Sequence, residues 1–253
     1  MGKIITFANQ KGGVGKTTSA VNVAASLGIL GKNVLLVDLD PQGNTTSGVG
    51  VAKKNLKNTT DAVLLDGVKA SDAVIKTKFT NLSVMPANIS LAGSELDLFR
   101  EENGESCLKR ALAEIKDDYD YIIIDCPPSL GMLTLNALVA SDGVIIPMQC
   151  EFYALEGLSQ LMITIGKIKQ SYNPALFVCG ILVTMFNGRL VLSMQVISEL
   201  KKHYADKLFK TAVSRNVRLS EAPGFGMPVY YHDKTSKGAA EYLEVAKELA
   251  ERI

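Results

Sequence analysis

Residues 9–18 read NQKGGVGKTT, a glycine-rich run between a short apolar stretch and the start of a helical pattern. The run matches the phosphate-binding loop G-x-x-x-x-G-K-[ST] except at its first position, where Gln10 replaces glycine. A strand, this loop and a helix in that order favour an α/β fold that binds phosphate at the loop. A second lysine, Lys11, precedes Lys16 by five residues, and an ordinary phosphate loop does not account for it.

Short apolar runs on both sides of this loop predict a sheet. They lack strict polar alternation, as strands covered on both faces do, and they occupy residues 4–8, 33–38, 82–87, 121–125, 143–148 and 176–186. Helical patterns occupy residues 16–30, 105–117, 131–140, 154–170, 190–204 and 236–251. This alternation predicts a mainly parallel, doubly wound sheet flanked by helices. Without repeats or Pro/Ser-rich linkers, residues 1–253 are expected to form a single domain.

Composition narrows the class of protein. A chain of 253 residues can bury a core without disulfides, and its four cysteines, Cys107, Cys126, Cys150 and Cys179, show no C-x-x-C pair or zinc-type spacing. No stretch reaches the ~18 apolar residues of a membrane span, and the N-terminus lacks a signal-peptide pattern. We therefore expect a reduced, unprocessed, cytoplasmic protein.

The loop residues have distinct chemical roles in phosphate binding. Gly12, Gly13 and Gly15 allow successive N–H groups to turn toward an anion, and the helix that follows adds its positive dipole end. Lys16 is predicted to contact the β- and γ-phosphates, and Thr17 to offer its hydroxyl to Mg²⁺. The predicted nucleotide-binding residues of this segment are Lys11, Gly12, Gly13, Val14, Gly15, Lys16, Thr17 and Thr18.

Acidic residues end two of the predicted strands. Asp38 and Asp40 stand in VLLVDLDPQG, and Asp125 stands in YIIIDCPPS. The carboxyl ends of parallel strands share one edge of the sheet with the phosphate loop. Although a lone aspartate at a strand end is often a helix cap, three beside a phosphate loop favour roles in holding Mg²⁺ and orienting water.

Four motifs together resemble one family. KGGVGKTT (11–18), LLVDLDPQGN (35–44), YIIIDCPPSLG (121–131) and RNVRLSEAPGFGMPV (215–229) are similar to the ParA/Soj family of deviant Walker A ATPases, relatives of MinD and the nitrogenase iron protein. The resemblance covers essentially the whole chain. It implies an ATPase that uses ATP and Mg²⁺ and forms an ATP-dependent homodimer.

The resemblance also implies a reason for two lysines. Lys16 takes the place of the ordinary loop lysine, while Lys11 takes that of the family's signature lysine, which reaches the partner subunit's nucleotide. Nucleotide binding and dimerisation then become linked. By the same resemblance Asp40 activates water, Asp38 is its partner on the Mg²⁺ side, and Asp125 is the Walker B acid.

Asn187, in TMFNGR, resembles the asparagine that reads adenine in related ATPases. A plain turn asparagine explains its position almost as well.

The distribution of charge bears on partners. Net charge is +1, but from Arg189 to Arg218 seven Lys or Arg residues face two acidic ones, whereas the rest of the chain has 20 basic and 24 acidic residues. Arg189, Arg215 and Arg218 match positions where the family contacts DNA. The resemblance therefore implies nonspecific double-stranded DNA, a ParB-type stimulating protein and a place on the nucleoid.

Three other readings use the same fold. A MinD-like membrane organiser needs a C-terminal amphipathic anchor, whereas AAEYLEVAKELAERI (239–253) reads as a packed helix, so no stable membrane association is expected. An iron–sulfur protein needs cysteines that face each other across a dimer. A ParA-like ATPase that positions a protein cargo stays open, as does the DNA footprint, because AVSRN (212–216) replaces the family's usual IPRN.

Overall fold

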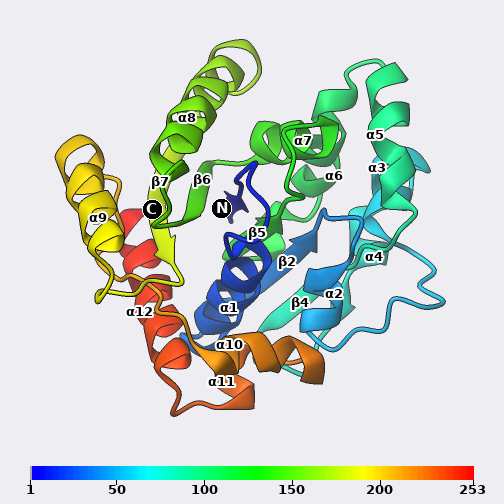
Figure 1. The fold of residues 1–253 in the computed structure, drawn as a ribbon. Coiled ribbons are helices and arrows are strands. Elements are labelled where there is room, and N and C mark those ends of the chain that lie inside the picture. The colour runs from blue at the N-terminus through cyan, green and yellow to red at the C-terminus, as the bar shows by residue number, and fades with distance from the viewer. Residues whose placement is uncertain (1) are drawn as a thin grey trace.

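The fold is built on one seven-stranded sheet with the order β3-β4-β2-β5-β1-β6-β7, seen in a computed structural model that describes residues 2–253 (Figure 1). Only the pair β3–β4 is antiparallel. The strands are β1 (Lys3–Phe7), β2 (Val34–Asp38), β3 (Ile75–Lys76), β4 (Leu82–Met85), β5 (Tyr121–Asp125), β6 (Gly143–Gln149) and β7 (Phe177–Thr184). The predicted fold class, a mainly parallel sheet flanked by helices, is confirmed.

Helices connect and cover the strands. The longer ones are α1 (Lys16–Ile29), α5 (Leu91–Arg100), α7 (Met132–Ala140), α8 (Ala154–Ser171), α9 (Val191–Tyr204) and α12 (Lys237–Arg252). The shorter ones are α2 (Asn44–Gly48), α3 (Thr60–Leu65), α4 (Ala70–Ala73), α6 (Cys107–Ala113), α10 (Val217–Glu221) and α11 (Val229–His232). Three 3-10 turns add Gly104–Ser106, Lys116–Asp118 and Ala222–Phe225. Within residues 2–253, no helix combines the length and apolar character needed to cross a bilayer.

One predicted helix was too long. The pattern over residues 105–117 forms α6 over Cys107–Ala113 only, with a 3-10 turn on each side. At its start, the backbone of Gly104 packs so closely on the carbonyl of Leu98 that a Cβ would overlap it. The chain makes a tight turn there before α6 begins. At its end, Ile115 has φ −122° and ψ 0°, outside the helical region. Strand β3, helix α5 and the short helices α2, α3, α4, α10 and α11 were not predicted.

The core forms on both faces of the sheet because the central strands are apolar throughout. Every residue of β2 and β5 is buried. On one face α1 packs against α12, where the Tyr242 hydroxyl lies 3.0 Å from the Ser19 hydroxyl. Apolar residues of α6 and α7 belong to a second buried cluster against the other face. The sheet is thus a rigid platform for the loops at its ends.

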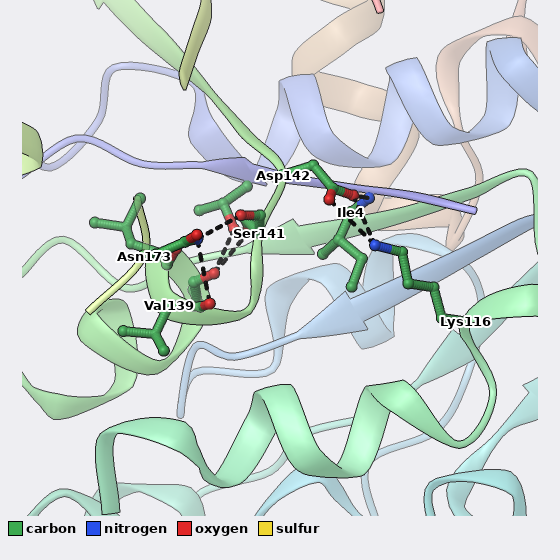
Figure 2. Close-up of polar contacts among 9 residues, drawn as sticks. Ile4, Lys116, Val139, Ser141, Asp142 and Asn173 are labelled. Carbon is green, nitrogen blue, oxygen red and sulfur yellow. Dashed lines mark hydrogen bonds and ion pairs between the residues drawn. The ribbon is translucent and has the colours of Figure 1, made fainter. Parts of the chain in front are cut away.

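Polar contacts tie together the amino ends of the strands (Figure 2). Asp142, just before β6, accepts the N–H of Ile4 at 2.8 Å and the ammonium of Lys116 at 3.0 Å. The buried Asn173 donates to the carbonyls of Val139 at 3.2 Å and Ser141 at 2.7 Å. These groups satisfy one another, so this end of the sheet is a structural clamp.

Candidate functional site

The predicted strand ends meet at the opposite, carboxyl edge of the sheet. Asp38 and Asp125 are register partners across β2 and β5, and Phe7, which leads into the glycine loop, is the register partner of Asp125 across β1 and β5. Residues separated by more than a hundred positions therefore converge at the point where the order of the strands reverses, the usual ligand site of an open α/β sheet.

The glycine loop is held by side chains from neighbouring strand ends. Gly13 and Gly15 have φ of +74° and +84°, a left-handed backbone that favours glycine. The Gln149 amide donates to the Gly13 carbonyl at 2.6 Å, and the Thr184 hydroxyl donates to the Val14 carbonyl at 2.7 Å. Since the carbonyls are fixed from outside, the loop N–H groups are arranged before a ligand arrives.

Lys16 is a buried ammonium that has no carboxylate partner in hydrogen-bond reach within residues 2–253. Its side chain is mostly buried at the start of α1, and its Nζ donates to the Lys11 carbonyl at 3.1 Å. Burial lowers the pKa of the Lys16 ammonium, while the charges of Asp125 and Asp40 act in the opposite direction. A buried cation of this kind suits a multiply charged anion in the loop.

Lys11 lies elsewhere, on the surface. Its ammonium forms an ion pair with the carboxylate of Glu151, between β6 and α8, and both side chains are about half exposed. The adjacent Phe152 and Tyr153 expose 75% and 72% of their surface. The two lysine side chains therefore point in different directions. Lys16 points into its own loop, and Lys11 points outward beside the exposed Phe152 and Tyr153.

Asp38 is buried and accepts three hydrogen bonds. Its Oδ2 accepts the Thr46 hydroxyl at 2.6 Å and the Thr46 N–H at 2.8 Å, and its Oδ1 accepts the Asp40 N–H at 3.2 Å. Burial raises the pKa of Asp38 to about 6 although these donors act in the opposite direction. Because both oxygens have partners from the chain, Asp38 suits an indirect contact to a cation better than a direct one.

Asp125 is buried with one oxygen unpaired. The Thr45 hydroxyl donates to its Oδ2 at 2.7 Å, while Oδ1 has no hydrogen-bond partner within residues 2–253. Burial and the neighbouring Asp38 charge raise the pKa of Asp125 to about 7. An unpaired carboxylate oxygen beside the loop is the observation that fits a hydrated Mg²⁺, for which oxygen is the preferred ligand.

A hollow of about 390 Å³ joins these groups, lined by loop glycines, Lys16, Thr17, Asp40 and Pro128. Asp40 is 7% exposed, and its Oδ1 accepts the Gln42 N–H at 2.9 Å. Thr17 stands at the first turn of α1 on the same hollow. The structure thus brings Lys16, Thr17 and Asp40 to one space, with Asp38 and Asp125 behind it.

A second hollow, of about 310 Å³, adjoins the first. The two share Gly15, Thr18 and Met185, so together they form one cleft along the start of α1. Its far wall comes from the segment 213–223, including Asn216 and Pro223. A partly apolar recess beside a phosphate loop is suited to a nucleotide base.

Asn187 does not line either hollow. Its side chain is exposed and accepts the N–H of Arg189 at 3.1 Å, as a turn asparagine does. Its reading as an adenine contact stays a prediction.

The three arginines predicted to contact DNA lie in different surroundings. Arg189 is exposed just before α9. Arg215 is exposed but lines the base hollow. Arg218 forms ion pairs with Glu221 at 2.8 Å and Asp233 at 3.3 Å. Of the three, Arg189 is therefore the best placed to bind a DNA phosphate, because Arg215 lines the base hollow and Arg218 is ion-paired.

The buried carboxylates lead to a pH prediction. Since the folded pKa values of Asp38 and Asp125 lie above their ordinary values, the folded protein without nucleotide or metal holds extra protons, and its stability falls as pH rises from about 4 through about 7. Asp125→Asn, which keeps the shape, is expected to be more stable than the unmodified chain at pH 8 by on the order of 2 kcal/mol, and less so at pH 5. Urea unfolding in EDTA at both pH values measures this, with the exposed Asp66→Asn as control; an unchanged pH dependence in Asp125→Asn contradicts it.

Comparison with known proteins identifies the family. Residues 2–178 match the protein family described as "AAA domain". The chain is 54% identical to the sporulation initiation inhibitor protein Soj of Bacillus subtilis (strain 168), covering 99% of both chains. It is 49% identical to the chromosome partitioning protein ParA of Myxococcus xanthus, covering 100% of this chain and 89% of that one. The chain belongs to the ParA/Soj family.

A solved structure extends the comparison of this ParA/Soj chain. It is similar, at 39% identity and a TM-score of 0.85, to a protein named cobyrinic acid a,c-diamide synthase from Mycobacterium smegmatis, solved with bound ADP and magnesium. The similarity covers 98% of this chain and 93% of that chain. Membership of the family makes the chain a partitioning-type ATPase with a P-loop fold.

Several site residues of this ParA/Soj chain were not predicted from its sequence. Gln149 and Thr184 brace the loop, and Thr45 and Thr46 contact the buried carboxylates. None stands in a pattern with a known chemical meaning, although the two threonines lie five and six residues after Asp40, which the sequence does predict as a site residue. The iron–sulfur reading loses support from placement, because Cys126 is fully buried.

Proposed function

We propose that the chain is a partitioning ATPase that binds ATP with Mg²⁺, dimerises around it and hydrolyses it slowly. The observation that carries this proposal is the convergence of the braced glycine loop, the buried Lys16 and the aspartates at one edge of the sheet. The relative solved with ADP and magnesium supports it. Basal turnover is expected to be slow, because a complex that hydrolyses ATP quickly would not persist long enough to be positioned.

Each site residue has a role in this proposal. The loop N–H groups and Lys16 would bind the phosphates, and Thr17 and Asp125 would hold Mg²⁺, with Asp38 behind them. When bound there, the ion would supply positive charge beside the phosphates. Asp40, which lines the phosphate hollow, orients the attacking water.

The dimer is proposed to form on the face that carries Lys11. The lysine and the exposed Phe152 and Tyr153 lie together outside the loop, so a second copy would receive both a cation and apolar surface. Each ATP would then contact both subunits, and loss of the γ-phosphate would weaken their association.

DNA is the proposed partner of the ATP-bound dimer, and a ParB-type protein the proposed stimulator of hydrolysis. The local excess of basic residues between Arg189 and Arg218 supports contact with phosphate rather than with bases. A dimer doubles the number of contacts without remodelling either subunit. We place the working complex on the nucleoid.

Arg189→Glu is expected to weaken DNA binding by about tenfold or more at moderate salt and to lower the slope of log affinity against log salt by about one or two. ATP-driven dimerisation should persist, because Arg189 lies outside both hollows. A mobility assay on unrelated duplexes, with ATP or ADP across a salt series, measures both effects.

The matched control is Lys109→Glu, an exposed charge reversal on α6. Equal DNA binding with ATP and ADP, or equal weakening by Arg189→Glu and Lys109→Glu, would remove DNA as the switched partner. A protein cargo or a membrane surface would then be the better candidate.

A further inference from the structure

Two adjacent threonines of α2 each contact one buried carboxylate of the site. Thr45 donates its hydroxyl to Asp125 at 2.7 Å, and Thr46 donates its hydroxyl to Asp38 at 2.6 Å. Both threonines and both aspartates are fully buried. The contacts span 80 residues in one case and 8 in the other, so they connect α2 to two different strands.

The direction of the Thr46 hydrogen bond is settled by a third group. The N–H of Ala87, just after β4, donates to the Thr46 Oγ1 at 2.9 Å. The Thr46 hydroxyl proton is therefore free to go to Asp38, which accepts it together with the Thr46 N–H on the same oxygen. The Asp38 carboxylate is fixed in rotation by donors on both of its oxygens.

Among the described residues, 2–253, a hydrogen bond fixes the Asp125 carboxylate at Oδ2 only. Thr45 occupies Oδ2, and this contact orients the unpaired Oδ1. Gly43, with φ of +62°, is the N-cap of α2, two residues before Thr45, and a Cβ there would come within 2.7 Å of the Ala87 carbonyl. The turn after Asp40 therefore has little freedom, and it delivers both hydroxyls to the carboxylates together.

We propose that Thr45 and Thr46 are positioning residues that orient Asp125 and Asp38 toward Mg²⁺, so that α2 must be docked on the sheet for the site to hold the metal. The proposal rests on the proposed function, in which these aspartates serve a Mg²⁺-nucleotide. Groups that orient metal-binding carboxylates through hydrogen bonds contribute to metal affinity in addition to the residues that touch the ion.

The test separates metal binding from nucleotide binding. Affinity for a fluorescent ADP analogue is measured with Mg²⁺ and with EDTA, and the ratio of the two affinities reports the contribution of the metal. Thr46→Val is expected to reduce this ratio by about tenfold, because it removes a donor to Asp38 and leaves the Ala87 N–H unpaired. Affinity in EDTA should change by less than about twofold, since the loop and Lys16 are untouched.

Three further variants sharpen the result. Thr46→Ser restores the hydroxyl and should recover the ratio. Thr45→Ala removes only the contact to Asp125 and should lower the ratio by about threefold, which keeps the proposal testable if Thr46→Val does not fold. Ser47→Ala is the matched control, because its hydroxyl donates to the Gly43 carbonyl at 3.1 Å and contacts neither aspartate.

The outcomes separate cleanly. Equal losses in Mg²⁺ and in EDTA for Thr46→Val and Thr45→Ala would reduce the threonines to packing groups and overturn the proposal while leaving the ATPase function intact. An unmodified chain that binds no ADP in either condition would instead defeat the proposed function, and the role of the threonines with it.

Discussion

Lys16→Ala is expected to abolish nucleotide binding, with a loss of affinity of at least about a hundredfold. The ammonium is buried, donates to a loop carbonyl and lines the phosphate hollow, and it is the one Lys or Arg among the residues that line this hollow within residues 2–253. Two charge-assisted hydrogen bonds to phosphate at ~1.5 kcal/mol each account for this magnitude. Equilibrium binding of a fluorescent ATP analogue measures the loss.

Lys11→Ala is the matched comparison, because it removes the other lysine of the same loop. Its ammonium is exposed and paired with Glu151, so nucleotide binding by the monomer should be nearly unchanged. Dimerisation with a non-hydrolysable ATP analogue should be lost in size-exclusion chromatography. A Lys11→Ala dimer of normal affinity would contradict the cross-subunit role, and equal loss of binding in both variants would contradict the division of labour between the lysines.

Asp40→Ala is expected to slow ATP hydrolysis by on the order of a hundredfold or more and to leave an ATP-bound dimer that persists. The carboxylate lines the phosphate hollow, so its loss removes a group that can orient water while Thr17 and Asp125 still serve Mg²⁺. Phosphate release and the lifetime of the dimer after ATP addition measure the two effects.

The control for this experiment is Asp66→Ala, an exposed acid at the end of α3. Its turnover should match that of the unmodified chain. Hydrolysis by Asp40→Ala at the unmodified rate would assign Asp40 to the turn, where its Oδ1 already accepts the Gln42 N–H.

Local patterns were sufficient to predict the central fold. The apolar runs of β1, β2 and β5 are buried almost throughout, so their sequence reports burial directly. The glycine loop also carries its own signal, because φ at Gly13 and Gly15 is left-handed. Parallel pairing then implies that the carboxyl ends share an edge, which is how Asp38 and Asp125 could be placed together before their register was known.

Contacts between distant segments could not be predicted in the same way. Gln149 and Thr184 reach the loop across 136 and 170 residues, and Thr45 reaches Asp125 across 80. Whether Arg218 is free or paired with Asp233 depends on how α10 meets the turn after α11. Helix α5 was missed because only Leu91, Ser94 and Leu98 are buried, while Leu96 and Phe99 are exposed.

The Lys11–Glu151 ion pair makes the proposed association of two subunits an exchange of partners. An exposed ion pair of this kind contributes about 0–1 kcal/mol to stability, so breaking it costs little. The net gain when Lys11 contacts a nucleotide is the attraction of Lys11 to the phosphates minus its attraction to Glu151. A triphosphate carries more negative charge than one carboxylate, so ATP would displace Glu151 from Lys11 more readily than ADP would. Glu151 would thereby compete with the nucleotide for Lys11 and make the lysine favour ATP over ADP. The size of this preference would depend on ionic strength, because salt screens both attractions.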